Sequence, residues 1–174
     1  KGMASNLANN NVPLTCYDID NSVFSELKNS NIRQSSDLKE LVDASEVVIT
    51  MLPDGPIVKD VWKKVIDLAK KKITLIDCST IDVNTSLEVQ NRANEKGFYT
   101  LDAPVSGGVM GANSGRLTFM VGGKSQTYQN CRYLFEIMGN KSILCGGFGA
   151  GQSAKICNNM LLASTMIAVG RVLN

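Results

Sequence analysis

Hydrophobic residues follow two alternating patterns along this chain. Short runs that are apolar at nearly every position, above all VVITML at 47–52 and ITLID at 73–77, predict β-strands covered on both faces. Between such runs, apolar residues return every three or four positions, as on the buried face of a helix. We expect strands at residues 13–17, 46–52, 73–77, 98–102, 117–121 and 142–145, and helices at 1–10, 21–29, 36–44, 56–72, 79–96 and 125–138.

Strands and helices alternate along the whole chain, and no linker or repeat interrupts them. This alternation predicts an α/β fold, a doubly wound and mostly parallel Rossmann-type sheet with helices on both faces. Residues 103–116 are so rich in glycine that we expect an irregular loop there. Ligands of such folds bind at the carboxyl ends of the strands, so a site is expected in the segments that follow them.

A further long helix is expected from about Gln152 onward, and it carries an unusual lysine. Lys155 is its only charged residue before Arg171, and the positions after it are apolar nearly all round, as in a core helix. The helix dipole and apolar surroundings both lower the pKa of a first-turn lysine, toward the range where it exchanges protons. Asn159 lies on the same face and can bind the same small molecule. The alternative is a lysine that reaches water from the helix end.

Composition narrows the classes of function. The formal charge of +2, without a basic stripe, argues against a nucleic-acid partner. The sequence has no histidine, which excludes Ser-His-Asp and Cys-His catalysis, and no tyrosine is followed four residues later by lysine, as in short-chain dehydrogenases. Proton transfer in this chain must therefore use lysine or a carboxylate.

Cysteines and apolar runs set further limits. The five cysteines include no C-x-x-C pair, which suits free thiols in a reducing compartment and provides no metal site. We expect no membrane span, because the apolar run at 160–169 is too short to cross a bilayer and has polar flanks.

Two features bear on a dinucleotide site. Asp18 follows the strand expected at 13–17, where Rossmann domains place an acid that binds a ribose; a solvated turn aspartate is an equal alternative. The segment GAGQSA at 149–154 has the form G-x-G-x-x-A, but no acidic residue follows it, whereas a true fingerprint has one about 20 residues on. We interpret its glycines as allowing a close backbone approach to a substrate or to the far end of a cofactor.

Three motifs in register carry a family resemblance. DAPVSGG at 102–108, LTFMVGG at 117–123 and GAGQSAKICNNM at 149–160, supported by MLP at 51–53 and IDCSTID at 76–82, resemble the β-hydroxyacid dehydrogenases. The resemblance runs along the whole chain. It implies oxidation of a small hydroxy acid, 3-hydroxyisobutyrate, to methylmalonate semialdehyde in valine breakdown, with hydride passing to NAD.

The resemblance also implies roles for individual residues. Lys155 corresponds to the family's proton-exchanging lysine, and Asn159 to the asparagine beside it. The loop that holds the substrate carboxylate corresponds to Ser106, Gly107 and Gly108. The residues that fall where the family contacts the dinucleotide are Asp18, Met51, Leu52, Pro53 and Thr80. The acid among them favours NAD over NADP.

By the same resemblance, two parts of the family's fold lie outside this sequence. Residues 1–7 match the helix after the glycine fingerprint, so the first, central strand is expected before residue 1, and a helical domain that supports a homo-oligomer after residue 174. Residues 1–151 are then a truncated NAD-binding domain, and 152–174 the start of an interdomain helix. Without the central strand, we expect this chain alone to fold poorly. Family habit places the protein in the mitochondrial matrix of a eukaryote, or otherwise in the cytoplasm.

Two other functions stay open at this point. One is a related β-hydroxyacid dehydrogenase, or a succinic or glyoxylic semialdehyde reductase that uses NADPH; these differ more from the sequence in the substrate loop and after the lysine. The other is a non-catalytic dinucleotide-binding or interaction module, as in family members that have lost the lysine. The presence of Lys155 and Asn159 argues against a module.

Overall fold

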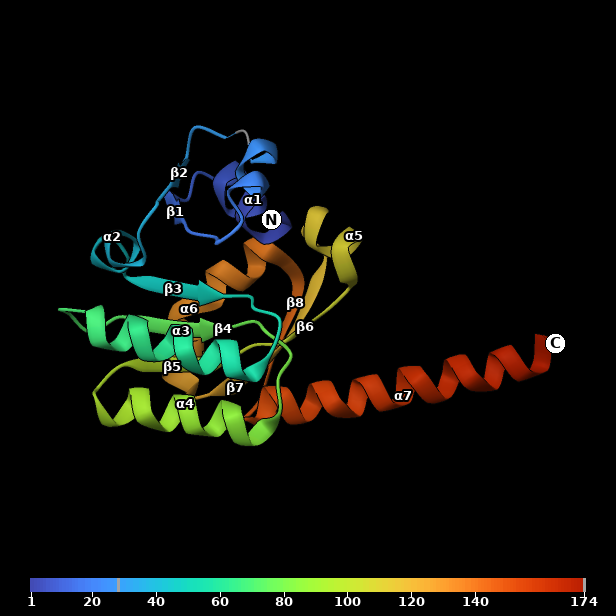
Figure 1. Ribbon diagram of the computed structural model, residues 1–174. Helices are drawn as coiled ribbons and strands as arrows, with labels where there is room; N and C mark the ends of the chain where they lie inside the picture. Colours follow the sequence, from blue (N-terminus) through green and yellow to red (C-terminus); the bar gives the residue numbers. More distant parts are fainter. Residues whose placement is uncertain (28, 174) are drawn as a thin grey trace.

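The computed structural model describes residues 1–27 and 29–173 and shows an α/β fold (Figure 1). Strands and helices alternate as the hydrophobic pattern predicts. The strands are β1 (Leu14–Cys16), β2 (Ile32–Gln34), β3 (Val47–Thr50), β4 (Thr74–Asp77), β5 (Tyr99–Asp102), β6 (Val105–Ser106), β7 (Leu117–Gly123) and β8 (Gly139–Gly146). The helices are α1 (Gly2–Asn9), a 3-10 helix (Asn21–Glu26), α2 (Leu38–Ala44), α3 (Gly55–Leu68), α4 (Val83–Glu95), α5 (Gly108–Asn113), α6 (Ser125–Met138) and α7 (Ala150–Leu173).

The larger sheet has six strands in the order β3-β4-β5-β7-β6, with β8 paired to β7. β3, β4 and β5 are parallel to one another, and β8 is parallel to β7. β7 runs antiparallel to β5 and β6. The predicted doubly wound, mostly parallel sheet is therefore confirmed, with one reversal of direction at β7. β1 and β2 form a separate parallel pair.

Two hydrophobic cores lie on the two faces of the larger sheet. α6 covers one face, where Phe119 of β7 contacts Phe135 of α6 with ring centroids 5.0 Å apart. α3 and α4 cover the other face, where Trp62 is almost completely buried (Figure 1). The carboxylates of Asp54 and Asp82 cap α3 and α4 by accepting backbone N–H bonds in the first turn, which fixes where each helix begins after the short segment that follows its strand.

Three sequence predictions about the elements are wrong. β2 was not expected, because a strand of three residues with only one partly buried position has no readable alternation. The glycine-rich segment 103–116 is not irregular: it contains β6 and α5, and β6 exists because Val105 and Ser106 pair with β7. The helix expected to reach residue 72 ends at Leu68. The end of the helix expected at 21–29 includes residue 28, which lies outside the described residues.

α7 differs from the expected core helix. It begins at Ala150, and only Gly151 and Gln152 are buried, so its apolar residues beyond the first turn are exposed in this chain. Figure 1 shows it extending away from the sheet. Its 24 residues make it long and apolar enough to cross a membrane by length and composition alone, contrary to the expectation from the run at 160–169. One such helix is weak evidence for a membrane span.

Gly122 allows the start of α7 to lie against β7. A Cβ at residue 122 would lie 2.7 Å from the Gly151 nitrogen and 2.8 Å from the Gly147 carbonyl oxygen, and closer still to the Asp102 carboxylate. We expect Gly122→Ala to lower the free energy of unfolding by about 1–3 kcal/mol, because a Cβ would push the start of α7 away from β7, against the hydrogen bonds by which Asp102 holds it. Gly147→Ala is the matched control, since a Cβ there meets nothing within 4 Å. Urea unfolding of both variants tests this; equal losses would contradict it.

Candidate active site

The carboxyl ends of the parallel strands lie at one edge of the larger sheet. Thr50 of β3 pairs in register with Asp77 of β4, and Asp77 pairs with Asp102 of β5. The segments 51–53 and 78–81 therefore leave the sheet side by side. This edge is where the alternation of elements predicted a site.

Beneath these two segments, a buried polar cluster fixes their position. The Asp77 Oδ1 accepts hydrogen bonds from the Thr50 hydroxyl at 2.8 Å and from the Ser79 hydroxyl at 2.6 Å. Ser79 Oγ in turn accepts the Leu52 N–H at 2.8 Å, and Trp62 Nε1 donates to Thr50 Oγ1 at 3.0 Å. The sequence reasoning missed this cluster, although the polar residues that end two buried strands are its signal.

Burial raises the pKa of the Asp77 carboxyl, and hydrogen bonds from Ser79 and Thr50 oppose that rise only in part. Its Oδ2 is buried and has no hydrogen-bond partner among the described residues. Burial in this cluster therefore shifts the Asp77 carboxyl toward its neutral form. Above it, Met51, Pro53 and Thr80 are exposed and Leu52 is half-buried, so the two segments present a rigid, accessible surface.

A second buried carboxylate, that of Asp102, holds the start of α7. The Gly149 N–H donates to its Oδ1 at 2.9 Å, and the Gln152 N–H donates to its Oδ2 at 2.9 Å. The Gln90 amide also donates to Oδ1, at 3.0 Å. A carboxylate here accepts the free N–H groups of a helix N-terminus and faces the positive end of its dipole. Asp102 thus fixes the first turn of α7 to β5.

The same contacts settle the interpretation of GAGQSA at 149–154. Two N–H groups of this turn are already bonded to Asp102, so they are not free to bind a pyrophosphate. The close approach that the glycines allow is to the protein itself, because a Cβ at Gly151 would lie 2.7 Å from the Asp102 carbonyl oxygen. The segment is not a phosphate fingerprint, as predicted, and its glycines serve packing instead of ligand approach.

Lys155 lies in this anchored part of α7. It is partly buried, and its ammonium group has no hydrogen-bond or ion-pair partner among the described residues. Burial lowers the pKa of the Lys155 ammonium below the 10.5 of an ordinary lysine, in the direction expected from the sequence. Asn159 is exposed one turn further along the same helix, where its Oδ1 accepts the Asn158 amide at 3.4 Å.

The loop predicted to hold the substrate carboxylate, residues 106–108, is a turn at the surface. Gly107 and Gly108 have φ values of 128° and 61°, which an L side chain rarely adopts, and both are exposed. A Cβ at Gly108 would meet nothing within 4 Å, so the space beside Gly108 is open, whereas a Cβ at Gly107 would lie 3.3 Å from the Leu117 side chain. Ser106 precedes it and is half-buried. In Figure 1, α5, which begins at Gly108, and α7 both lie on the side of the sheet where β3 and β4 end.

Asp18 lies apart from these residues, just after β1 in the smaller sheet. It is exposed, and its Oδ1 accepts the Asp20 N–H at 3.0 Å. This geometry fits both interpretations drawn from the sequence, a ribose-binding acid and a turn aspartate.

The residues present fit a dinucleotide at this edge. Met51 leaves 56% of its surface exposed after β3, and Thr80 is exposed after the neighbouring β4, a combination suited to a flat ring and a ribose. The described residues contain no group of histidine, cysteine or carboxylate side chains that could hold a metal ion.

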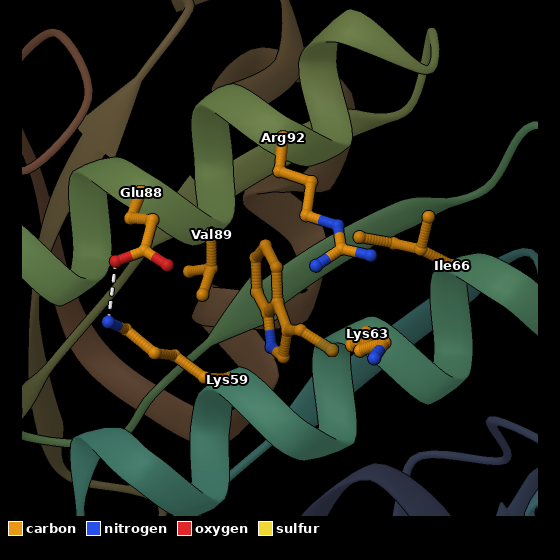
Figure 2. A pocket seen from close by; sticks show the side chains of 7 residues that line it. Lys59, Lys63, Ile66, Glu88, Val89 and Arg92 are labelled. Carbon is orange, nitrogen blue, oxygen red and sulfur yellow. Dashed lines mark ion pairs between the residues drawn. The ribbon is translucent and has the colours of Figure 1, made fainter.

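Figure 2 shows a small pocket between α3 and α4, on the outer surface of these helices. Its interior of about 20 Å³ holds no more than a water molecule. An ion pair between Lys59 and Glu88 closes one side. The residues that line it are Lys59, Trp62, Lys63, Ile66, Glu88, Val89 and Arg92. It is therefore not a substrate site.

Comparison with known proteins agrees with this geometry. The sequence family described as the NAD binding domain of 6-phosphogluconate dehydrogenase matches residues 1–147. The chain belongs to this family of NAD-binding domains, which confirms the predicted fold class and cofactor.

Several relatives are 3-hydroxyisobutyrate dehydrogenases. A mitochondrial 3-hydroxyisobutyrate dehydrogenase of Mus musculus is 41% identical over 99% of this chain and 52% of its own length. A probable 3-hydroxyisobutyrate dehydrogenase of Mycobacterium bovis is 48% identical over 75% of this chain and 44% of its own. A structure of the Mycobacterium tuberculosis enzyme with L-serine superposes with a TM-score of 0.92 at 39% identity, over 98% of this chain and 59% of that one. The predicted resemblance is confirmed, and the chain spans about half the length of these curated relatives.

Proposed function

We propose that this chain is the NAD-binding part of a 3-hydroxyisobutyrate dehydrogenase, which oxidises its substrate to methylmalonate semialdehyde. The observation that carries the proposal is Lys155: a partly buried lysine without a partner, on a helix turn that Asp102 anchors at the edge where β3 and β4 end. The high identity to dehydrogenases of this name supports the choice of substrate.

In this proposal, each part of the site has one task. Bound NAD supplies a nicotinamide ring that accepts hydride. Neutral Lys155 takes the proton of the substrate hydroxyl while the C–H bond gives up hydride, and Asn159 orients that hydroxyl. Ser106 and the backbone N–H groups at Gly107 and Gly108 bind the substrate carboxylate, because two glycines leave those N–H groups uncovered.

The proposed cofactor contacts follow the same edge. Met51, Leu52 and Pro53 after β3 and Thr80 after β4 lie against the dinucleotide, and Asp18 binds the adenosine ribose. An acid at that position repels the phosphate of NADP, which favours NAD.

We also propose how the chain fits into a longer protein. Residues 1–151 form the dinucleotide-binding domain, and 152–174 begin a helix that leads into a second, helical domain, whose surface covers the exposed apolar residues of α7. In that longer protein, an additional strand lies beside both β1 and β3 in space and joins the two sheets, which are separate in this chain. The full protein acts as a homo-oligomer on a small hydroxy acid without nucleic acid or membrane, in the mitochondrial matrix or, in a bacterium, in the cytoplasm.

Substrate and cofactor comparison tests the proposed function. A protein extended to the length of its relatives is assayed with 3-hydroxyisobutyrate and with succinic semialdehyde, each with NAD(H) and NADP(H). We expect the highest kcat/KM for 3-hydroxyisobutyrate with NAD. Higher values for succinic semialdehyde with NADPH would show a semialdehyde reductase instead, and NAD binding without turnover of either substrate would show a non-catalytic module.

The pH dependence of the oxidation provides an independent check on Lys155. The reaction needs neutral lysine, whose fraction rises as pH increases through the pKa of the group. Because burial lowers the pKa of Lys155, we expect kcat/KM to rise with pH and to reach half its plateau below pH 10.5. A profile that is flat from neutral to alkaline pH would contradict proton transfer by Lys155.

A further inference from the structure

Gln152 is the most deeply buried polar side chain of α7, and its contacts lead away from its own helix. Its side chain is fully buried, with 0% of its surface exposed. The side-chain Nε2 donates to the Ser79 carbonyl oxygen at 2.8 Å, and Oε1 accepts the Ile81 N–H at 3.2 Å. One amide therefore bonds to a backbone donor and a backbone acceptor of the same segment.

These two backbone groups flank Thr80. The Ser79 carbonyl belongs to the peptide bond before Thr80, and the Ile81 N–H to the peptide bond after it. The Gln152 amide thus fixes the two peptide planes that flank Thr80, the proposed cofactor contact. Because Thr80 itself is exposed, no packing of its side chain provides that restraint.

Gln152 also lies on the same face of α7 as Lys155, three residues before it. Its backbone N–H is held by Asp102 at 2.9 Å, so the turn that carries both residues is fixed to β5. The side chain and the backbone of a single residue therefore join the cofactor segment, the sheet and the lysine turn.

We propose that Gln152 is a positioning residue that sets the spacing between Thr80 and Lys155. This inference rests on the proposed function, since it takes Thr80 as a cofactor contact and Lys155 as the proton acceptor. Loss of the amide leaves the cofactor segment tied to β4 through Ser79 and Asp77, but no longer tied to α7. Binding of NAD should then survive while the alignment for reaction is lost.

Gln152→Met, which keeps the length and volume of the side chain, tests the proposal in the extended protein. We expect kcat to fall by about 10- to 100-fold, because small misplacements of reacting groups have effects of that size. The dissociation constant of NAD, measured by calorimetry without substrate, should change by less than about threefold, since the hydrogen bonds of Ser79 remain. Hydrogen exchange of the Ile81 amide should accelerate.

Thr100→Val is the control. Thr100 is a buried residue of β5 whose hydroxyl has no hydrogen-bond partner among the described residues, so the variant removes a buried polar group outside the contacts of Gln152 and Asp102. It should retain kcat and the slow exchange of the Ile81 amide. Gln152→Asn, which keeps a polar group but is one methylene shorter, provides a second variant if Gln152→Met does not fold, with the same expected loss.

Two results would overturn the inference: a kcat within twofold of the parent in the Gln152 variants, or equal losses in Thr100→Val and Gln152→Met. Lys155→Ala, assayed alongside, separates this failure from that of the proposed function. If Lys155→Ala keeps its turnover, the proposed function and the inference both fail. If it is inactive while Gln152→Met is fully active, only the positioning role fails.

Discussion

Lys155→Ala is expected to reduce kcat for 3-hydroxyisobutyrate oxidation by about 10²- to 10⁴-fold, the range for loss of a positioned general base. The side chain is partly buried, has no partner among the described residues and has a lowered pKa, so it is available to take a proton. Affinity for NAD should be retained, since the proposed cofactor contacts lie on other segments.

Two further variants make this result specific. Lys155→Arg keeps the positive charge but not the ability to lose a proton near neutral pH, so it should be as inactive as Lys155→Ala. Lys141→Ala removes an exposed lysine of β8 and should behave as the parent. Substantial turnover by Lys155→Arg would mean that the charge of the side chain, and not its proton exchange, supports the reaction.

The second large effect concerns the two buried carboxyl groups at the ends of neighbouring strands. Asp102→Asn should lower the free energy of unfolding by roughly 2–4 kcal/mol, because one oxygen that accepts an N–H becomes an NH₂ that faces a donor. Both oxygens of Asp102 accept such bonds, from Gly149 and Gln152 of the α7 turn.

Asp77→Asn is the matched variant, and it should cost less than about 1 kcal/mol. Burial raises the pKa of Asp77, and its Oδ2 has no partner among the described residues, so a neutral amide replaces the carboxyl with little change. Urea unfolding of both variants in the extended protein measures the difference. A larger loss for Asp77→Asn than for Asp102→Asn would contradict the role given to Asp102 as the anchor of α7.

The repeated pattern of hydrophobic positions was sufficient to predict most of the fold. Buried strands such as β3 and β4 are apolar at nearly every position, and α3 has one clear apolar face, so local sequence determines them. β2 and β6 have two or three residues each and exist only through pairing with another strand. Pairing of this kind leaves no periodic signal in the sequence, which explains why both were missed.

The sequence likewise predicted some residues of the candidate site and missed others. Lys155 could be found because a single charge in a long apolar helix is visible in the sequence. The roles of Asp102 and Gln152 could not, because their hydrogen-bond partners lie 47 to 73 residues away in the chain. The residues proposed to bind a ligand were suggested by residue type and by the family resemblance, whereas the residues that hold the site together require the folded structure.

The exposure of α7 has a related explanation. Its sequence predicts a core helix, yet only its first turn is buried in this chain. The chain spans about half the length of its curated relatives, and the proposed helical domain supplies a surface for those apolar residues. The predicted burial of α7 is therefore not observed in this chain, and we propose that the longer protein supplies the covering surface.

The most direct test is a crystal structure of the extended protein with NAD and 3-hydroxyisobutyrate bound. The account predicts that Lys155 Nζ lies within hydrogen-bond reach, about 2.6–3.2 Å, of the substrate hydroxyl, with the carboxylate at the Gly107–Gly108 turn. A lysine directed into solvent, with the hydroxyl held by other groups, would contradict it.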